Sequence, residues 1–231
     1  RRASDMAATS RDKAARPAAA VSDHLVEELR RRIVDHAVAP GVALREQDLA
    51  TEFGVSRARV RDAFNILEER GLIERVRNRG AMVTRLDPRK AGKLFEVREV
   101  LEAQMVRLAT ENAPAGSWDD LVELFGAGMD AKLAANDLGG YEDAVHLFRR
   151  RCIEAAENEV LSDLLDSLYD RTRVLIRRLV LVPGRAQEGM RQHRDILAAM
   201  RDGDAEEAER LKRENIRSAR EWFNTYREYL L

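Results

Sequence analysis

The stretch from Arg45 to Leu86, REQDLATEFGVSRARVRDAFNILEERGLIERVRNRGAMVTRL, constrains the fold more than any other part of this chain. Apolar residues recur at helical spacing over 46–53 and again over about 57–70. Each segment ends at a glycine, Gly54 or Gly71, and glycine readily takes the left-handed conformation that terminates a helix. The pattern predicts two short helices with a sharp turn between them.

A helix before this pair and a β-hairpin after it complete the predicted unit. Residues 22–36 carry apolar side chains at helical spacing, and Pro40-Gly41 then forces a turn. Residues 72–76 and 81–84 are strand-like, and the connecting residues 77–80 include Asn and Gly, which tolerate the positive φ of a tight hairpin. Three helices and a hairpin are the layout of a winged helix-turn-helix, which predicts DNA binding.

The rest of the chain is predicted to be helical. Asp87 is a plausible N-cap, and Pro88 follows it at the first helical position. Ser117-Trp118-Asp119-Asp120 has the form of a capping box that opens a second helix. Further helices are expected at about 141–157, 159–180, 185–201 and from a cap at 204–207 almost to Leu231. The pattern predicts an all-α bundle of six to seven helices.

The composition agrees with a mostly α protein of two domains. Charged residues are 35% of the 231 residues and aromatic residues only 5%, which suits a helical protein better than a β-sandwich. We expect a disordered tail over 1–20, the winged helix-turn-helix over 21–86 and the helical domain over 87–231. Residues 1–20 lack the apolar segment of a secretory signal, and no apolar run is long enough to span a membrane, so we expect a cytoplasmic protein without a membrane partner. The single cysteine, Cys152, excludes an intrachain disulfide and is predicted to be a small buried apolar residue.

Charge is distributed unevenly between the two predicted domains. Residues 1–86 hold 17 Lys and Arg against 13 Asp and Glu, whereas residues 87–231 hold 23 against 28. A basic N-terminal part and an acidic remainder are typical of a DNA-binding domain joined to one that does not bind DNA, although a difference of a few charges also arises by chance.

Basic side chains stand where such a domain would contact DNA. Arg57, Arg59 and Arg61 lie near the start of the second helix of the pair, where guanidinium groups reach base edges or phosphates. Ser56 at the helix start is expected to contact a phosphate, and Arg77 and Arg79 at the hairpin tip a backbone or a minor groove. The alternative is that these arginines only solvate an exposed surface. Their concentration on this layout favours DNA binding.

At this point the sequence resembles a known family. SRARVRDAFNILEERGLIERVRNRGAMV at 56–83 resembles the signature of GntR-family transcription regulators, roughly S-R-x-P-V-R-x-A-L followed by G-L-I and N-R-G-A-x-V. Arg59 stands where the family often has proline, and Phe64 where it often has leucine. The resemblance implies that Ser56, Arg57 and Arg61 recognise DNA and that Gly80 shapes the wing.

The helical domain resembles the FadR-type effector domain called FCD. The similarity lies in FEVREVLE at 95–102, CIEAAEN at 152–158 and QHRDILAAMRDGDAEEA at 192–208. It implies a homodimer that binds an inverted-repeat operator on double-stranded DNA and responds to a small organic acid. The expected function is therefore that of a ligand-responsive transcriptional regulator, and we expect a repressor. The 86–93 junction, where the hairpin meets the first helix of the bundle, is the expected hinge.

Many members of that family hold a metal ion with one Asp and three His. Carried over residue by residue, these four positions fall on His146, Arg150, His193 and Asn215. A permanently cationic Arg150 repels a divalent ion and Asn215 is a poor ligand for a transition metal, so we expect no metal cofactor, with His146 and His193 as weak candidate ligands.

The same four residues suggest a different way of binding an acid. We expect Arg150 to replace the metal as a bidentate anchor for the effector carboxylate, with His146, His193, Asn215 and Arg98 around it. Arg173 and Arg177 are further candidates, either for the cavity or for the surface. The alternative is that Arg150 pairs with an acidic residue and that the pocket is vestigial.

Three other functions compete with a ligand-responsive regulator. A metal-dependent acid sensor of the same family would use His146 and His193. An architectural DNA binder would not need so large an acidic helical domain. An enzyme is not expected, because no nucleophile–base set, carboxylate pair or phosphate loop accompanies the two histidines.

Overall fold

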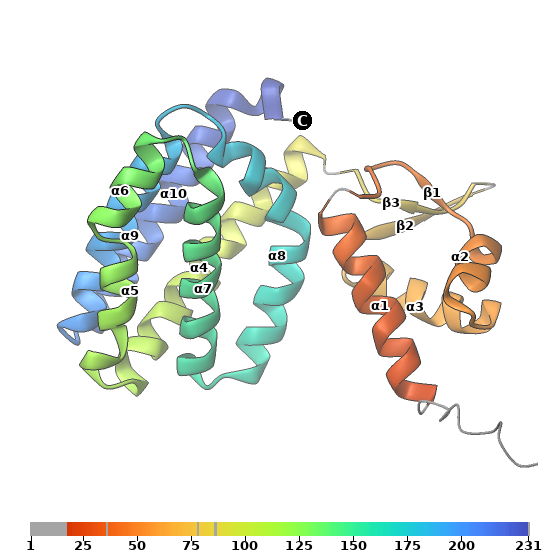
Figure 1. Ribbon diagram of the computed structural model, residues 1–231, viewed down its shortest axis with the longest axis horizontal. Coiled ribbons are helices and arrows are strands. Elements are labelled where there is room, and N and C mark those ends of the chain that lie inside the picture. Colours follow the sequence, from red (N-terminus) through yellow and green to blue (C-terminus); the bar gives the residue numbers. More distant parts are fainter. Residues whose placement is uncertain (1–17, 36, 78, 86, 231) are drawn as a thin grey trace, which may run out of the picture.

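The structure, a computed structural model, describes residues 18–35, 37–77, 79–85 and 87–230. Two parts are evident in Figure 1, and we call them the head and the body. The head contains α1 (Ala18–Val34), β1 (Ala43–Leu44), α2 (Glu46–Phe53), α3 (Arg57–Glu69), β2 (Ile73–Val76) and β3 (Gly80–Val83). The body contains α4 (Pro88–Asn112), the 3-10 helix η1 (Ala115–Trp118), α5 (Asp119–Leu124), α6 (Ala127–Ala134), α7 (Leu138–Ala156), α8 (Glu159–Val180), α9 (Arg185–Arg201) and α10 (Ala205–Leu230).

The head is a winged helix-turn-helix, as the sequence predicts. Gly54 ends α2 at φ 63°, and the Ser56 side chain caps α3 by accepting from the Arg59 N–H. The three strands form an antiparallel sheet in the order β1-β3-β2, with Val76 opposite Gly80 at the hairpin. The apolar faces of the helices and the sheet meet in one core, which includes Leu25, Leu29, Val60, Phe64, Leu67, Ile73 and Val83.

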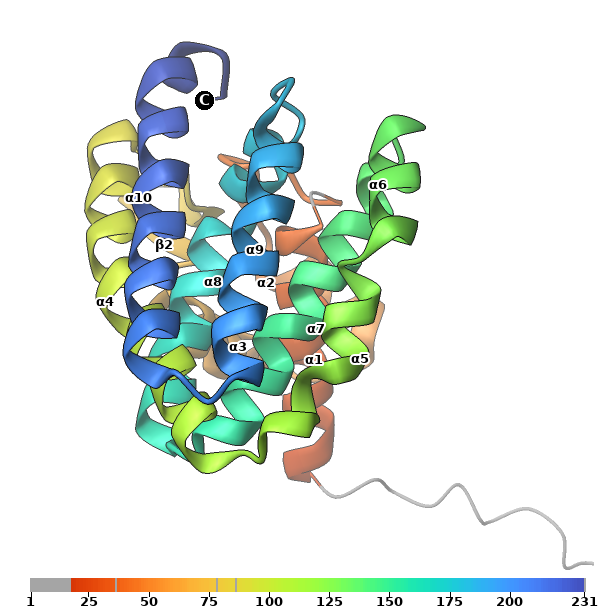
Figure 2. The same cartoon turned by 90° about the vertical axis from the view of Figure 1, so that its left-hand side faces the viewer.

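The body is an all-α bundle around a second apolar core. Helix α10 packs along α4 and beside α9, an arrangement that Figure 2 shows from the side opposite the head. Asp87, Asn158 and Asp204 each accept a backbone N–H at a helix start, as expected for N-caps. Cys152 is fully buried in this core, which confirms its predicted place, and burial raises the pKa of its thiol to about 12.

The predicted second helix of the body is interrupted. Ser117 lies within η1 and does not cap the helix, so the predicted capping box is wrong. The chain breaks again at Gly126, where a Cβ atom would lie 2.8 Å from the Glu123 carbonyl oxygen. The Arg194 guanidinium donates to the carbonyls of Phe125 and Gly126, and these hydrogen bonds stabilise the separate helices α5 and α6.

Two features at the N-terminal side differ from the sequence interpretation. Helix α1 begins at Ala18, inside the range 1–20 that we expected to be a tail, while residues 1–17 lie outside the described residues. Strand β1, which the sequence did not predict, pairs Ala43 with Met82. Two residues are too short for an alternating pattern, so only the partner strand makes this segment a strand.

Candidate functional site

The exposed face of α3 carries the predicted arginines, and one acidic residue of α2 holds two of them. Arg57 and Arg61, one turn apart, both contact Glu46, at 3.3 Å and 2.9 Å between nitrogen and carboxylate oxygen. Burial raises the pKa of Glu46, but hydrogen bonds from Arg61 and Arg57 outweigh it and lower that pKa overall. More than half of each arginine side chain stays exposed. Both guanidinium groups are therefore accessible to phosphates and bases, in competition with Glu46.

The other predicted contacts lie around the same surface. The Ser56 hydroxyl accepts from the Arg59 N–H at 3.4 Å, and the Arg59 side chain is half-buried. Arg77 and Arg79 are exposed at the hairpin tip, and Gly80 has φ 77°, which explains a glycine there. Arg75, which sequence reasoning missed, reaches Asn65 and Glu68 of α3 and so ties the hairpin to that helix.

A cavity of about 430 Å³ lies in the body. Its walls come from α4, α7, α8, α9 and α10. The polar side chains that line it are Asp35, Arg98, Tyr141, Glu142, Asp143, His146, Arg149, Tyr169, Arg173, Arg177, Arg185, His193 and Asn215. Arg98, His146, His193 and Asn215 are thus brought together at the cavity, as are both of the further candidates, Arg173 and Arg177.

Arg150 is the predicted residue that the structure places elsewhere. Its side chain is 68% exposed and lies 3.8 Å from Glu154, in an exposed pair outside the cavity lining. Arg149 lines the cavity instead, together with Val145 one turn earlier. Successive residues of a helix are rotated by about 100° around its axis, so an error of one position in the sequence comparison moves a side chain from the cavity to the surface.

Beside the cavity lies a buried cluster of charges, of which sequence reasoning named Arg98 and missed Glu102 and Lys212. Arg98 Nε and Lys212 Nζ lie 2.7 Å and 2.9 Å from the Glu102 carboxylate, and all three side chains are at most 2% exposed. Burial opposes ionisation of Glu102, but the charges of Arg98 and Lys212 outweigh it and hold its pKa well below the usual range. The only available sequence signal was the placement of Glu102 and Lys212 on apolar faces of their helices. The cluster carries two cations for one carboxylate and so makes this part of the body electropositive.

His193 lies in the wall as a neutral imidazole. Its Nδ1 is 2.7 Å from the Gly189 carbonyl oxygen, which requires the proton on Nδ1 and leaves Nε2 as a hydrogen-bond acceptor. Burial, reinforced by the charge of Lys212, lowers the pKa of His193 to about 3. Phe125 stacks on the ring and Phe148 meets it edge-on.

Several buried polar atoms around the cavity have no hydrogen-bond partner among the described residues. The donors are Arg98 Nη1, Arg149 Nε, Arg185 Nη1 and the Tyr169 hydroxyl, and the acceptor is His193 Nε2. The Arg149 guanidinium also lies over the Tyr169 ring, with its Cζ atom 4.6 Å from the centre of the ring. Buried polar groups are nearly always satisfied by protein, water or ligand, so these donors make the cavity suited to groups that accept hydrogen bonds.

Comparisons with known proteins agree with both parts of the molecule. Residues 21–83 match the model of the bacterial regulatory proteins of the gntR family, and residues 93–218 match the FCD domain, which by itself spans more than half of the chain. The chain belongs to the GntR family of FCD-domain transcription regulators.

Individual relatives cover most of this GntR-family chain. The HTH-type transcriptional repressor RspR of Escherichia coli is 29% identical over 83% of this chain and 84% of its own length. The Glc operon transcriptional activator of Escherichia coli is 26% identical, with 87% of each protein covered. The structure of E. coli McbR/YncC superposes with a TM-score of 0.70 at 20% identity, covering 90% of this chain and 98% of that one, and shows that the fold is shared.

The metal that many family members hold does not fit the cavity of this regulator. Within the described residues, no group of three or more His, Cys, Asp or Glu side chains is placed to hold a metal ion. Arg98, Arg149 and Arg185 line the cavity, with Lys212 buried behind it, and their positive charges oppose a divalent cation. Asn215 has both ends of its amide occupied, by Gln192 and Lys212.

A search of the helices that the structure describes finds none with the length and apolar character of a membrane span.

Proposed function

We propose that this GntR-family regulator is a homodimeric repressor whose FCD cavity binds a small organic anion and thereby changes operator affinity. The observation that carries the proposal is the cluster of unpaired donors from Arg98, Arg149, Arg185 and Tyr169 around one cavity. Three guanidinium groups and a phenol match the acceptor oxygens of a carboxylate better than any neutral group. The effector anchor that we assigned to Arg150 thus passes to Arg149.

The cavity also limits what else the effector carries. Because neutral His193 presents only an acceptor at Nε2, the ligand needs a donor on that side, such as a hydroxyl group. A small hydroxy acid satisfies both requirements. The cavity volume of about 430 Å³ suits a ligand of that size.

The DNA-binding part of the proposal rests on α3 and the hairpin. Arg57 and Arg61 are exposed on one face of α3, and Arg77 and Arg79 are exposed at the wing tip. In a homodimer two such heads match an inverted repeat. Exposed large apolar side chains on the body, among them Val100 and Leu164, are available for association of two copies. We choose repression because RspR, the more similar of the two relatives, is a repressor, whereas the Glc operon regulator is an activator.

The test begins with an operator that the 231-residue chain selects from random DNA. Isothermal titration calorimetry with succinate, citrate and gluconate then measures effector binding, and operator affinity is measured with and without the acid that binds. We expect Arg149→Met to weaken acid binding by roughly 10- to 100-fold, as expected for loss of a charged hydrogen bond. Arg150→Met, on the same helix but outside the cavity, is the matched control and should bind like the wild type.

Two results would contradict the proposal. If Arg149→Met and Arg150→Met lost acid affinity equally, the assignment of Arg149 as the anchor inside the cavity would be wrong. Stoichiometric binding of zinc that disappears in His193→Ala would favour the metal-dependent sensor instead. Sedimentation in the same buffers tests the dimer, and a reporter gene behind the selected operator tests repression.

A further inference from the structure

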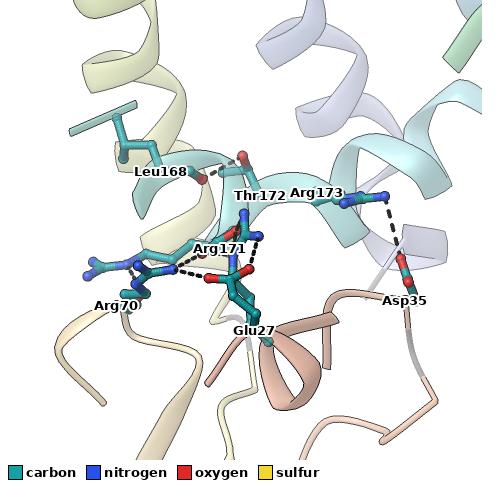
Figure 3. A network of polar contacts seen from close by, with 9 residues as sticks. Glu27, Asp35, Arg70, Leu168, Arg171, Thr172 and Arg173 are labelled. Atoms are coloured by element: carbon teal, nitrogen blue, oxygen red, sulfur yellow. Dashed lines mark hydrogen bonds and ion pairs between the residues drawn. The ribbon is translucent and has the colours of Figure 1, made fainter. Parts of the chain in front are cut away.

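The mouth of the effector cavity includes a residue of the head. Asp35 directly follows α1, yet it lines the cavity together with Arg173 of α8. Its Oδ1 atom lies 3.5 Å from Arg173 Nη2, and Figure 3 shows this pair joining the two parts of the molecule. A side chain of the DNA-binding part is therefore within reach of whatever occupies the cavity.

Arg173 is shared between the head and the cavity wall. It lines the cavity together with His146 of α7, and after burial its charge is the largest influence that lowers the pKa of that imidazole. It also opposes the rise that burial causes in the pKa of Glu142, whose carboxylate lies 3.4 Å from Arg177. An anion in the cavity near His146 would therefore compete with Asp35 for the Arg173 guanidinium.

Neighbouring residues of α8 hold the end of α3. Arg171 donates to the carbonyl oxygens of Arg70 and Glu69, at 2.8 Å and 3.0 Å, and so occupies free carbonyls at the C-terminus of that helix. Asp170, only 1% exposed, accepts two hydrogen bonds from Arg30 of α1. Figure 3 shows Arg171 and Arg173 on α8, with Arg70 and Asp35 of the head facing them, and in Figure 1 this helix lies on the side of the body next to the head.

The Asp170–Arg30 pair and the Asp35–Arg173 pair, which both join the head to α8, differ in strength. The Asp170–Arg30 pair is short, bidentate and buried on the Asp170 side. The Asp35–Arg173 pair is longer, and its side chains are 34% and 45% exposed. Exposed ion pairs contribute little and are easily exchanged, so the second pair is the one that a ligand can replace.

We propose that an anion in the cavity takes Arg173 from Asp35 and thereby loosens the end of α1 from α8, which alters how the head is held for DNA. This coupling rests on the proposed effector function, because it needs an anion in the cavity. The anion binds better once Asp35 releases Arg173, and by reciprocity its binding disfavours the docked arrangement of the head.

A carboxylate built into the wall tests the coupling without any ligand. In full-length protein, His146→Glu places a negative charge on α7 beside Arg173, and His146→Gln is the matched neutral control. We expect His146→Glu and Asp35→Asn each to raise amide hydrogen exchange of residues 31–35 several-fold, and the double variant no further. Exchange in His146→Glu equal to that in His146→Gln, or additive effects in the double variant, would overturn the coupling.

A titration separates this proposal from the effector function. Succinate, citrate and gluconate are titrated into wild type and Asp35→Asn. For an acid that binds, we expect Asp35→Asn to bind it roughly two- to fivefold more tightly, the range of an exposed ion pair. Equal affinities would refute the coupling and leave the effector function intact. If none of the acids binds while His146→Glu loosens α1, the effector function fails for those acids and the coupling between wall and head stands.

Discussion

Glu46 pairs with Arg57 and Arg61, the two arginines of α3 that we propose to contact DNA. If they do, a phosphate has to displace Glu46 from them. We predict that Glu46→Gln raises affinity for DNA of any sequence by roughly two- to fivefold, because an exposed pair is lost and a like charge is removed from the phosphates. Fluorescence anisotropy with the operator and a scrambled duplex measures this.

The companion variant is Arg61→Ala. It should abolish discrimination between operator and scrambled duplex while the protein sediments as the wild type does. If operator affinity were unchanged in Arg61→Ala, the placement of α3 against the bases would be incorrect.

His193 makes stability depend on pH. Its pKa is lowered from 6.5 to about 3, so between these values the unfolded chain binds a proton that the folded protein does not. Stability contributed by the neutral imidazole is therefore present above pH 6.5 and is lost as the pH falls toward 3.

We predict that the difference in unfolding free energy between wild type and His193→Gln shrinks by about 2 kcal/mol from about pH 6.5 to about pH 5. Urea unfolding across this range measures it. His24→Gln, at an exposed position of α1, is the control and should follow the wild type. A difference between wild type and His193→Gln that is constant with pH would mean that the imidazole titrates normally in the folded protein.

The same residue scale shows where sequence reasoning is fragile. His193 and Asn215 were found because the resemblance to the FCD family carries its metal-ligand positions onto them, and the structure places both, with Arg98, buried at the cavity. Arg149 and Arg150 are adjacent arginines on one helix, and only the packing of α7 decides which of them faces inward.

Among the connections between elements, Gly71 links the end of α3 to β2 and lies against Arg171 of α8. It has φ 71°, and a Cβ atom there would lie 2.7 Å from Arg171 Nε. We predict that Gly71→Ala destabilises the protein by about 1–3 kcal/mol, because the backbone is strained and Arg171 must leave the carbonyls of α3. Thermal unfolding measures this. Gly92→Ala is the matched control: it lies within α4 with open space around it, so it should stabilise by about 0.5–1 kcal/mol. Equal effects of the two variants would contradict the close contact at Gly71.

The elements differ in how far local sequence determines them. Helices α2, α8 and α9 have the predicted bounds, because a clear apolar period is limited by glycine, an Asn cap or proline. The break between α5 and α6 is stabilised by Arg194, which donates to the carbonyls of Phe125 and Gly126 from a helix almost 70 residues later. A contact so distant in the sequence leaves no local pattern from which the break could be predicted.

The two parts of the chain carry opposite net charge, which bears on the proposed binding to DNA. The first 86 residues carry a surplus of four positive charges, 17 against 13, and the remainder a surplus of five negative charges, 23 against 28. Because a negatively charged body is repelled by the phosphates, this distribution supports the proposal that the head is the part that approaches DNA.

The wings test this arrangement through salt dependence. We predict that the double variant Arg77→Ala and Arg79→Ala weakens binding about equally on operator and scrambled DNA, because phosphate contacts carry no sequence information. The plot of log affinity against log salt should become shallower by about two for each head and about four for a dimer. Arg61→Ala, in contrast, should act mainly on sequence discrimination. A salt dependence that stays unchanged in the wing variant would show that the hairpin tip does not reach the DNA, and a change of about two in all would indicate that a single head is engaged.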